Sequence, residues 1–142
     1  MEPRLSIVTL GVADLPRAIR FYRDGLRFQT NAKDDDDIAH FATTGTLLGL
    51  YPLKKLAEDI SPGVRLSAGG FAGITLAHTV RKKAEVAEVL ACAKKAGGTI
   101  VKEAQDAFWG GYAGYFADLD GYYWEVAWNP HSRFDDAGNL LI

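Results

Sequence analysis

Hydrophobic and polar positions follow strand-like and helix-like spacing in an order that occurs twice along the chain. The first apolar run, residues 5–12, contains β-branched residues and predicts a strand. Apolar residues then recur three and four positions apart, as on one face of a helix, at Leu15, Ala18, Ile19 and Tyr22. Asp14 is the expected N-cap of that helix, and Gly25 is expected to end it in the left-handed conformation.

The rest of the first half predicts three more strands. Residues 28–31 fit a short strand, and residues 38–43 and 46–51 fit a hairpin around Thr44 and Gly45. A short helix is expected at residues 54–59. The glycine-containing stretch 60–70 predicts the loop that joins the two halves.

The second half repeats the order of the first. Residues 71–80 predict a strand, residues 82–96 the most regular helix, and residues 99–103 another strand. Glycines at 97 and 98 are expected to stop the helix. The half ends in an aromatic hairpin whose turn is the sequence from Asp118 to Gly121, where Asp118 can accept hydrogen bonds from the backbone ahead and Gly121 can supply a positive φ.

This repeated order predicts an α+β fold made of two βαβββ modules, which form a curved mixed sheet around a cleft. We expect a single domain over residues 1–142, with the first module at about 1–60, the second at about 69–130 and a C-terminal tail at 131–142. Concave junctions of this kind are favoured places for ligand sites.

Composition narrows the class of protein. The formal net charge is −2 and the basic residues are scattered, so we expect no nucleic-acid partner. Cys92 is the one cysteine, which excludes an intrachain disulfide and a cysteine-based zinc site. The sequence holds no apolar stretch of about 18 residues and no signal-peptide pattern, so a cytoplasmic protein without a membrane span is expected.

Four consecutive aspartates, Asp34 to Asp37, lie between the expected strand at residues 28–31 and the expected strand at residues 38–43. They lack the alternating ligands, the mid-loop glycine and the final glutamate of a calcium-binding loop. We therefore expect a solvated hairpin tip here, because like charges repel and favour exposure to water.

Two motifs resemble the vicinal oxygen chelate superfamily, which includes glyoxalase I, bleomycin resistance proteins and extradiol dioxygenases. One is the pair of segments 10–15 (Leu-Gly-Val-Ala-Asp-Leu) and 21–26 (Phe-Tyr-Arg-Asp-Gly-Leu). The other is segment 115–126, Tyr-Phe-Ala-Asp-Leu-Asp-Gly-Tyr-Tyr-Trp-Glu-Val. The resemblance implies the two-module fold and a homodimer. It leaves the reaction open, because the superfamily includes isomerases, oxygenases, transferases and binding proteins.

The resemblance also implies where a divalent metal would bind. The expected ligand positions are the first strand of each module, the last strand of the first module and the final strand. In this chain they are Ile7, Thr75, the segment 48–50 and Glu125. Only Glu125 is a good ligand, because isoleucine has no lone pair and a neutral threonine binds divalent ions poorly. If Thr75 faces the cleft, strand alternation places His78 on the opposite face. We expect no metal and no other cofactor. The alternative that the resemblance leaves open is a metal-dependent or metal-independent lyase, isomerase or dioxygenase of the same superfamily.

Glu125 is thus the candidate functional residue, and three interpretations of it stay open. It can anchor an amine, hydroxyl or guanidinium group of a small ligand of aromatic or cationic character, or act as a metal-free general base with Tyr115 or His40 as the acid. It can also be a structural carboxylate in a packed sheet. The expected ligand-binding residues around it combine aromatic walls with polar or apolar lining: Tyr115, Tyr112, Trp109, Tyr123, Tyr51, Phe41, His40, Thr75 and Ile7.

Overall fold

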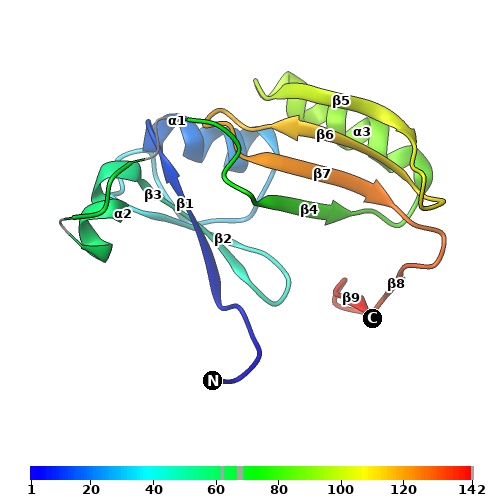
Figure 1. Ribbon diagram of the computed structural model, residues 1–142, viewed down its shortest axis with the longest axis horizontal. Coiled ribbons are helices and arrows are strands. Elements are labelled where there is room, and N and C mark those ends of the chain that lie inside the picture. The colour runs from blue at the N-terminus through cyan, green and yellow to red at the C-terminus, as the bar shows by residue number, and fades with distance from the viewer. Residues whose placement is uncertain (62, 67–68, 142) are drawn as a thin grey trace. The chain divides into compact units, whose positions relative to one another are not determined.

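The computed structural model describes residues 1–61, 63–66 and 69–141 of the chain. It forms two compact units, Met1–Ala72 and Gly73–Ile142. Each unit combines a sheet with helices (Figure 1). The predicted α+β class is confirmed.

The first unit contains β1 (Ile7–Val12), α1 (Leu15–Arg20), η1 (Phe21–Gly25), β2 (Ala39–Ala42), β3 (Leu47–Pro52) and α2 (Leu53–Ile60). Its sheet has the order β1-β3-β2, with β1 parallel to β3 and β2 antiparallel to β3. The expected strand at 28–31 is reduced to a single bridge between Gln29 and Ala42, at the free edge of β2.

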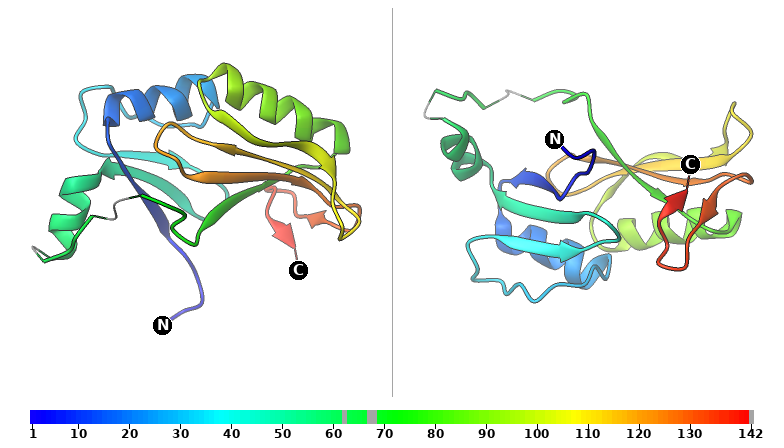
Figure 2. Two further views of the ribbon diagram at one scale, coloured as in Figure 1. Left: turned by 45° about the horizontal axis from the view of Figure 1, so that its top comes forward. Right: turned by 90° about the horizontal axis from the view of Figure 1, so that it is seen from below.

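The core of the first unit lies between the sheet and α1, which covers one sheet face (Figure 2). Alternate residues of the strands point toward the helix and are almost fully buried, as are the residues of the helical stripe: Leu10, Val12, Phe41, Leu48, Leu50, Leu15, Ala18, Ile19 and Tyr22. Burial of such side chains contributes about 1.5–3 kcal/mol each to folding.

The end of the first helix differs from the prediction. The chain widens into one π-helical turn, η1, and Arg27 rather than Gly25 takes the left-handed conformation, with φ 62°. The turn closes by backbone hydrogen bonds from Leu26 N to Phe21 O and from Phe28 N to Tyr22 O, both 2.9 Å. The helical segment still ends at Gly25, but the left-handed residue lies two positions later than predicted.

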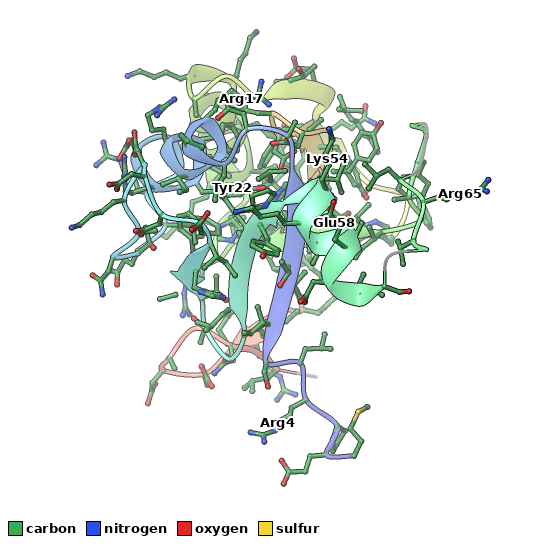
Figure 3. The ribbon with its side chains drawn as sticks, turned by 90° about the vertical axis from the view of Figure 1, so that its left-hand side faces the viewer. Arg4, Arg17, Tyr22, Lys54, Glu58 and Arg65 are labelled. Atoms are coloured by element: carbon green, nitrogen blue, oxygen red, sulfur yellow. The ribbon has the colours of Figure 1, made fainter. Side chains whose placement is uncertain are left out.

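The short helix α2 follows β3 directly and packs against β1. A Cβ atom on Gly11 would lie 2.5 Å from Leu53 Cδ1, so only a glycine at this position lets α2 approach the strand. Lys54 and Glu58 project from the exposed side of α2 one turn apart (Figure 3).

The aspartate run is exposed but not free. Asp34 binds Arg20 (2.6 Å) and Arg23 (2.9 Å), and Asp37 binds Lys55 of α2 (2.8 Å). The prediction of a merely solvated tip is incomplete, because opposite charges on neighbouring helices partly neutralise the run. These ion pairs lower the pKa of Asp34 and of Asp37.

The second unit contains β4 (Thr75–Thr79), α3 (Lys83–Lys95), β5 (Thr99–Asp106), β6 (Tyr112–Ala117) and β7 (Tyr123–Trp128). The sheet order is β4-β7-β6-β5, with β4 parallel to β7 and the other pairs antiparallel. In each of these two sheets the first strand along the chain thus pairs in parallel with the last strand of the same sheet, β1 with β3 and β4 with β7. This shared pairing gives the predicted duplication a structural basis.

Local sequence signals explain both ends of α3. At its start the Glu85 carboxylate accepts hydrogen bonds from the backbone N–H groups of Arg81 (3.0 Å) and Lys82 (3.1 Å). At its end Gly97 has φ 107°, and Gly98 N donates to Ala93 O at 2.9 Å. The predicted glycine stop is confirmed.

The predicted turn between the aromatic strands β6 and β7 is also confirmed. The buried Asp118 carboxylate accepts hydrogen bonds from the backbone N–H groups of Asp120 (3.0 Å) and Tyr122 (2.9 Å). Gly121 has φ 89°, the positive value that the turn requires. This turn fixes the register in which β6 and β7 pair.

Residues after β7 form a small hairpin of β8 (Arg133–Phe134) and β9 (Leu140–Leu141). The guanidinium carbon of Arg81 lies 4.7 Å from the centroid of the Phe134 ring. The expected C-terminal tail is therefore a folded hairpin within the second unit.

Candidate ligand-binding site

The strands of the second unit separate their side chains onto two faces. Trp124 and Val126 of β7 are buried on the face that α3 covers, where the Trp124 ring stacks on Phe116 with centroids 6.1 Å apart. Tyr123 and Glu125 alternate to the opposite face. We call that opposite side of the sheet the Glu125 face. Its members described below are Thr75, Ala77, Lys102, Tyr115, Tyr123 and Glu125.

Glu125 lies at the centre of this face. Its cross-strand neighbours are Ala77 on β4 and Tyr115 on β6. The neighbour on β4 has only a methyl side chain, and the neighbour on β6 is a phenol. Glu125 is half-buried.

The Tyr115 hydroxyl forms a hydrogen bond with the Glu125 carboxylate. Partial burial is the largest cause that raises the pKa of Tyr115, and the hydrogen bond and negative charge of Glu125 raise that pKa further. The phenol therefore keeps its proton at neutral pH and acts as the donor, with the carboxylate as the acceptor.

A lysine adjoins this pair. Lys102 on β5 is the register partner of Tyr115, and its Nζ atom lies 5.8 Å from the centroid of the Tyr115 ring. Lys102 was not among the predicted site residues. Strict alternation along β5 from Ile100, which faces α3, would place Lys102 under α3. A register shift between Ile100 and Lys102 overturns that expectation.

Of the expected site residues in this unit, Thr75, Tyr115, Tyr123 and Glu125 share the Glu125 face. Thr75 is exposed and pairs in register with Tyr123. His78 pairs with Val126 on the face toward α3, as strand alternation from Thr75 predicts. Desolvation lowers the pKa of His78, and the nearby Glu85 carboxylate opposes that shift.

One aromatic residue of the second unit does not join that face, contrary to expectation. Tyr112 alternates to the α3 side of β6, where Lys83 Nζ lies 4.6 Å from its ring centroid. Trp109 lies in the turn before β6 and folds over Gly111, where a Cβ atom would be 1.6 Å from its ring. A role of Trp109 in ligand binding stays a prediction.

The expected site residues of the first unit lie on both faces of its sheet. Ile7, His40 and Tyr51 lie on the face opposite α1: Ile7 pairs with Leu47, His40 with Gly49 and Tyr51 with Gly11. Ile7 is 45% exposed. A Cβ on Gly49 would be 3.3 Å from Ile7 Cγ2, which confirms that these residues share a face.

Phe41 is a correction to the predicted ligand wall. Its ring is completely buried on the α1 side of the sheet, 5.8 Å from the Tyr22 ring and 6.4 Å from the Phe28 ring between centroids. Its place in strand β2, one residue from His40, puts it on the core face. Phe41 therefore belongs to the aromatic core and not to a binding surface.

Metal-ligating side chains do not cluster in the part of the chain that the structure describes: no group of three or more His, Cys, Asp or Glu residues could hold an ion there. At the positions where the family resemblance implies ligands, Ile7 offers no donor atom and Thr75 a neutral hydroxyl. Glu125 is the one charged donor of that set.

Comparison with known proteins agrees with the duplicated fold. The model of the Glyoxalase/Bleomycin resistance protein/Dioxygenase superfamily matches residues 4–126. A glyoxalase-related enzyme from Fulvimarina pelagi is 31% identical, with a TM-score of 0.87 over 99% of this chain and 98% of that one. The chain therefore belongs to this superfamily. A search of curated protein sequences gave no significant match.

More distant solved structures share the fold. A glyoxalase/bleomycin resistance protein/dioxygenase family enzyme from Burkholderia phytofirmans PsJN is 18% identical, with a TM-score of 0.77 over 88% of this chain and 98% of that one. Lactoylglutathione lyase from Agrobacterium tumefaciens is 22% identical, with a TM-score of 0.68 over 91% of this chain and 96% of that one. Among the described residues, no helix has the length and apolarity needed to cross a membrane.

Proposed function

We propose that the protein binds a small organic molecule on the Glu125 face, without a divalent metal, and that Glu125 anchors an ammonium or another hydrogen-bond donor of that molecule. The observation that carries the proposal is the half-buried carboxylate of Glu125, which has the Tyr115 phenol on one side and Ala77 on the other. A partly desolvated carboxylate attracts a cationic group more strongly than an exposed one.

Aromatic side chains on the same face support an aromatic or cationic ligand. Tyr115 and Tyr123 flank Glu125 across and along the strands. Phenol rings offer a flat apolar surface for stacking and attract cations to their faces. Such rings around one charged group are typical of small-molecule sites.

The donor chemistry supports a site that works without a metal. A divalent ion held by Glu125 would need further ligands, and Ile7 and Thr75 stand where the resemblance implies them. Hydrocarbon and neutral hydroxyl side chains fit that role poorly. We therefore assign Glu125 to the ligand itself.

Binding of benzylamine, a small aromatic cation, tests this function. Isothermal titration calorimetry is suitable because Trp124 lies on the opposite face of the sheet, where its fluorescence would respond weakly. We expect Glu125→Gln to weaken binding about tenfold or more, since a charge-assisted hydrogen bond is lost. Lys94→Gln, on the exposed side of α3, is a matched control that should leave binding unchanged.

The Tyr115–Glu125 hydrogen bond favours a second candidate function, metal-free proton transfer. A carboxylate base paired with a protonated phenol could remove a proton from a carbon acid and stabilise the resulting oxyanion. Deuterium exchange at the methylene carbon of 2-amino-1-phenylethanone in D2O, followed by NMR, would measure it. Exchange that the wild type accelerates and Glu125→Gln does not would support catalysis.

The chain is further proposed to form a homodimer. Apolar side chains on the face of the first sheet opposite α1 are well exposed, with Ile7 at 45% and Leu47 at 38%. A second copy could cover them. Light scattering should then give twice the chain mass of 15.5 kDa, and a monomer would contradict this assembly.

A further inference from the structure

We propose that Lys102 is a second charged anchor of the same site, and that the ligand carries a cationic group at one end and a carboxylate or similar anion at the other. This inference rests on the proposed function, because Glu125 binds the cationic end. It adds the class of ligand and a specificity-determining residue.

Strand register places the two charges on one face with an aromatic ring between them. Glu125 on β7 pairs with Tyr115 on β6, and Tyr115 pairs with Lys102 on β5. Because neighbouring strands are about 4.8 Å apart, the backbones at Glu125 and Lys102 are separated by roughly 10 Å. The Lys102 side chain folds back over the Tyr115 ring, with Nζ 5.8 Å from its centroid. A flat molecule with opposite charges at its two ends matches this arrangement.

A β-bulge brings Lys102 to this face. Ile100 pairs with Phe116, but Lys102 pairs with Tyr115, so two steps along β5 match one step along β6. Without the extra residue, Lys102 would share the α3 side with Ile100. Bulges commonly redirect a side chain beside a functional site.

Gly114 allows the bulged strand to approach β6. A Cβ atom at this position would lie 2.8 Å from the carbonyl oxygen of Lys102 and 2.5 Å from Leu90 Cδ1. Both contacts are too short for any residue larger than glycine. The position of Lys102 is therefore built into two strands and does not depend on one side-chain rotamer.

Both charges are available to a ligand. Within residues 1–61, 63–66 and 69–141, neither Lys102 nor Glu125 forms an ion pair. By contrast, Lys83 also lies over a tyrosine ring but binds the Asp106 carboxylate at 2.7 Å. The Lys83 charge is satisfied within the protein, whereas the Lys102 ammonium can bind an anion.

Two probes that differ in one group test the proposal by calorimetry at neutral pH and low ionic strength. They are benzylamine and 4-(aminomethyl)benzoate, which adds a carboxylate across the ring. We expect the wild type to bind the carboxylate probe about tenfold more tightly, as one charge-assisted contact allows. Lys102→Gln should abolish that preference, because the carboxylate probe loses its partner. It should not weaken benzylamine binding, because loss of a nearby positive charge does not disfavour a cation. Lys102→Arg should retain much of the preference. Lys94→Gln is the control and should keep the full preference.

The outcomes separate this inference from the function on which it rests. If the wild type binds both probes equally, or Lys102→Gln weakens both equally, Lys102 is not a ligand anchor, although Glu125 can still be one. If benzylamine binds but Glu125→Gln has no effect, the proposed function fails, and the inference with it. Failure of both probes to bind the wild type overturns both.

Discussion

Tyr115 on β6 donates a hydrogen bond from its phenol to the carboxylate of Glu125, the residue directly opposite it on β7. The contact joins the two strands of the aromatic hairpin at the midpoint of their shared face. It holds the carboxylate in place, and it gives that carboxylate a proton donor. A ligand ammonium would bind to oxygen lone pairs that the phenol leaves free.

The titration of Tyr115 should report this contact. Burial and Glu125 raise its pKa above the ordinary value of 10.0, so the folded protein holds the proton more tightly than the unfolded chain does. The resulting stability is present in full below about pH 10 and is lost as pH rises through the folded pKa. Glu125→Gln should lower the pKa of Tyr115, while burial still keeps it above the ordinary value.

Ultraviolet absorbance of tyrosinate between about pH 9 and 12 measures that shift. The chain has six tyrosines, so the Tyr115 step is assigned by its loss in Tyr115→Phe. Tyr123→Phe serves as the control on the same face. An unchanged Tyr115 step in Glu125→Gln would contradict the hydrogen bond.

Asp118 should contribute strongly to stability. Asp118→Ala removes the acceptor of two backbone hydrogen bonds in the buried turn between β6 and β7, and we expect a loss of about 1–3 kcal/mol in the free energy of unfolding. Asp118→Asn keeps an oxygen in the same place and should cost less. Urea denaturation measures both, and equal losses would show that the oxygen acceptor is not the cause.

Gly114→Ala tests the packing of the bulge. The added Cβ would meet the Lys102 carbonyl oxygen and Leu90, and overpacking of this kind costs about 1–3 kcal/mol. Gly63→Ala is the matched control, because a Cβ there meets no atom of the described residues within 4 Å. If the two variants have the same free energy of unfolding by urea denaturation, the result would contradict the close contact between β5 and β6 at Gly114.

The ion pairs of the aspartate run should contribute a small, salt-sensitive stability. Arg20 and then Arg23 lower the pKa of Asp34, so the contribution is present above the ordinary aspartate pKa and is lost as pH falls below it. At pH 7 and low salt, Asp34→Asn should lower Tm. The same substitution at the exposed neighbouring residue, Asp35→Asn, should not. The difference should shrink in about 1 M NaCl. A salt-independent difference would argue against ion pairing.

The order of elements was predictable because it depends on local signals. The helical stripe of α1, the glycine stop of α3 and the Asp118 turn each act within a few residues, and the structure contains all three. The end of the first helix was wrong because a π turn shifted the left-handed residue to Arg27. Hydrogen-bond spacing of that kind leaves no clear trace in the apolar pattern.

The site was only partly predictable, because a strand's face depends on register. Tyr115, Tyr123 and Glu125 follow simple alternation and share a face. Lys102 was missed because an extra residue in β5 reverses the alternation. Phe41 was predicted on the wrong face, because alternation along β2 puts it opposite His40, on the buried side.

A crystal structure of the protein grown with benzylamine, with anomalous data collected for transition metals, tests the central claim most directly. The account predicts the ammonium of benzylamine within hydrogen-bond distance of the Glu125 carboxylate, about 2.7–2.9 Å, with Tyr115 still bound to that carboxylate. A divalent metal ion on Glu125, or benzylamine bound only away from the Glu125 face, would contradict it.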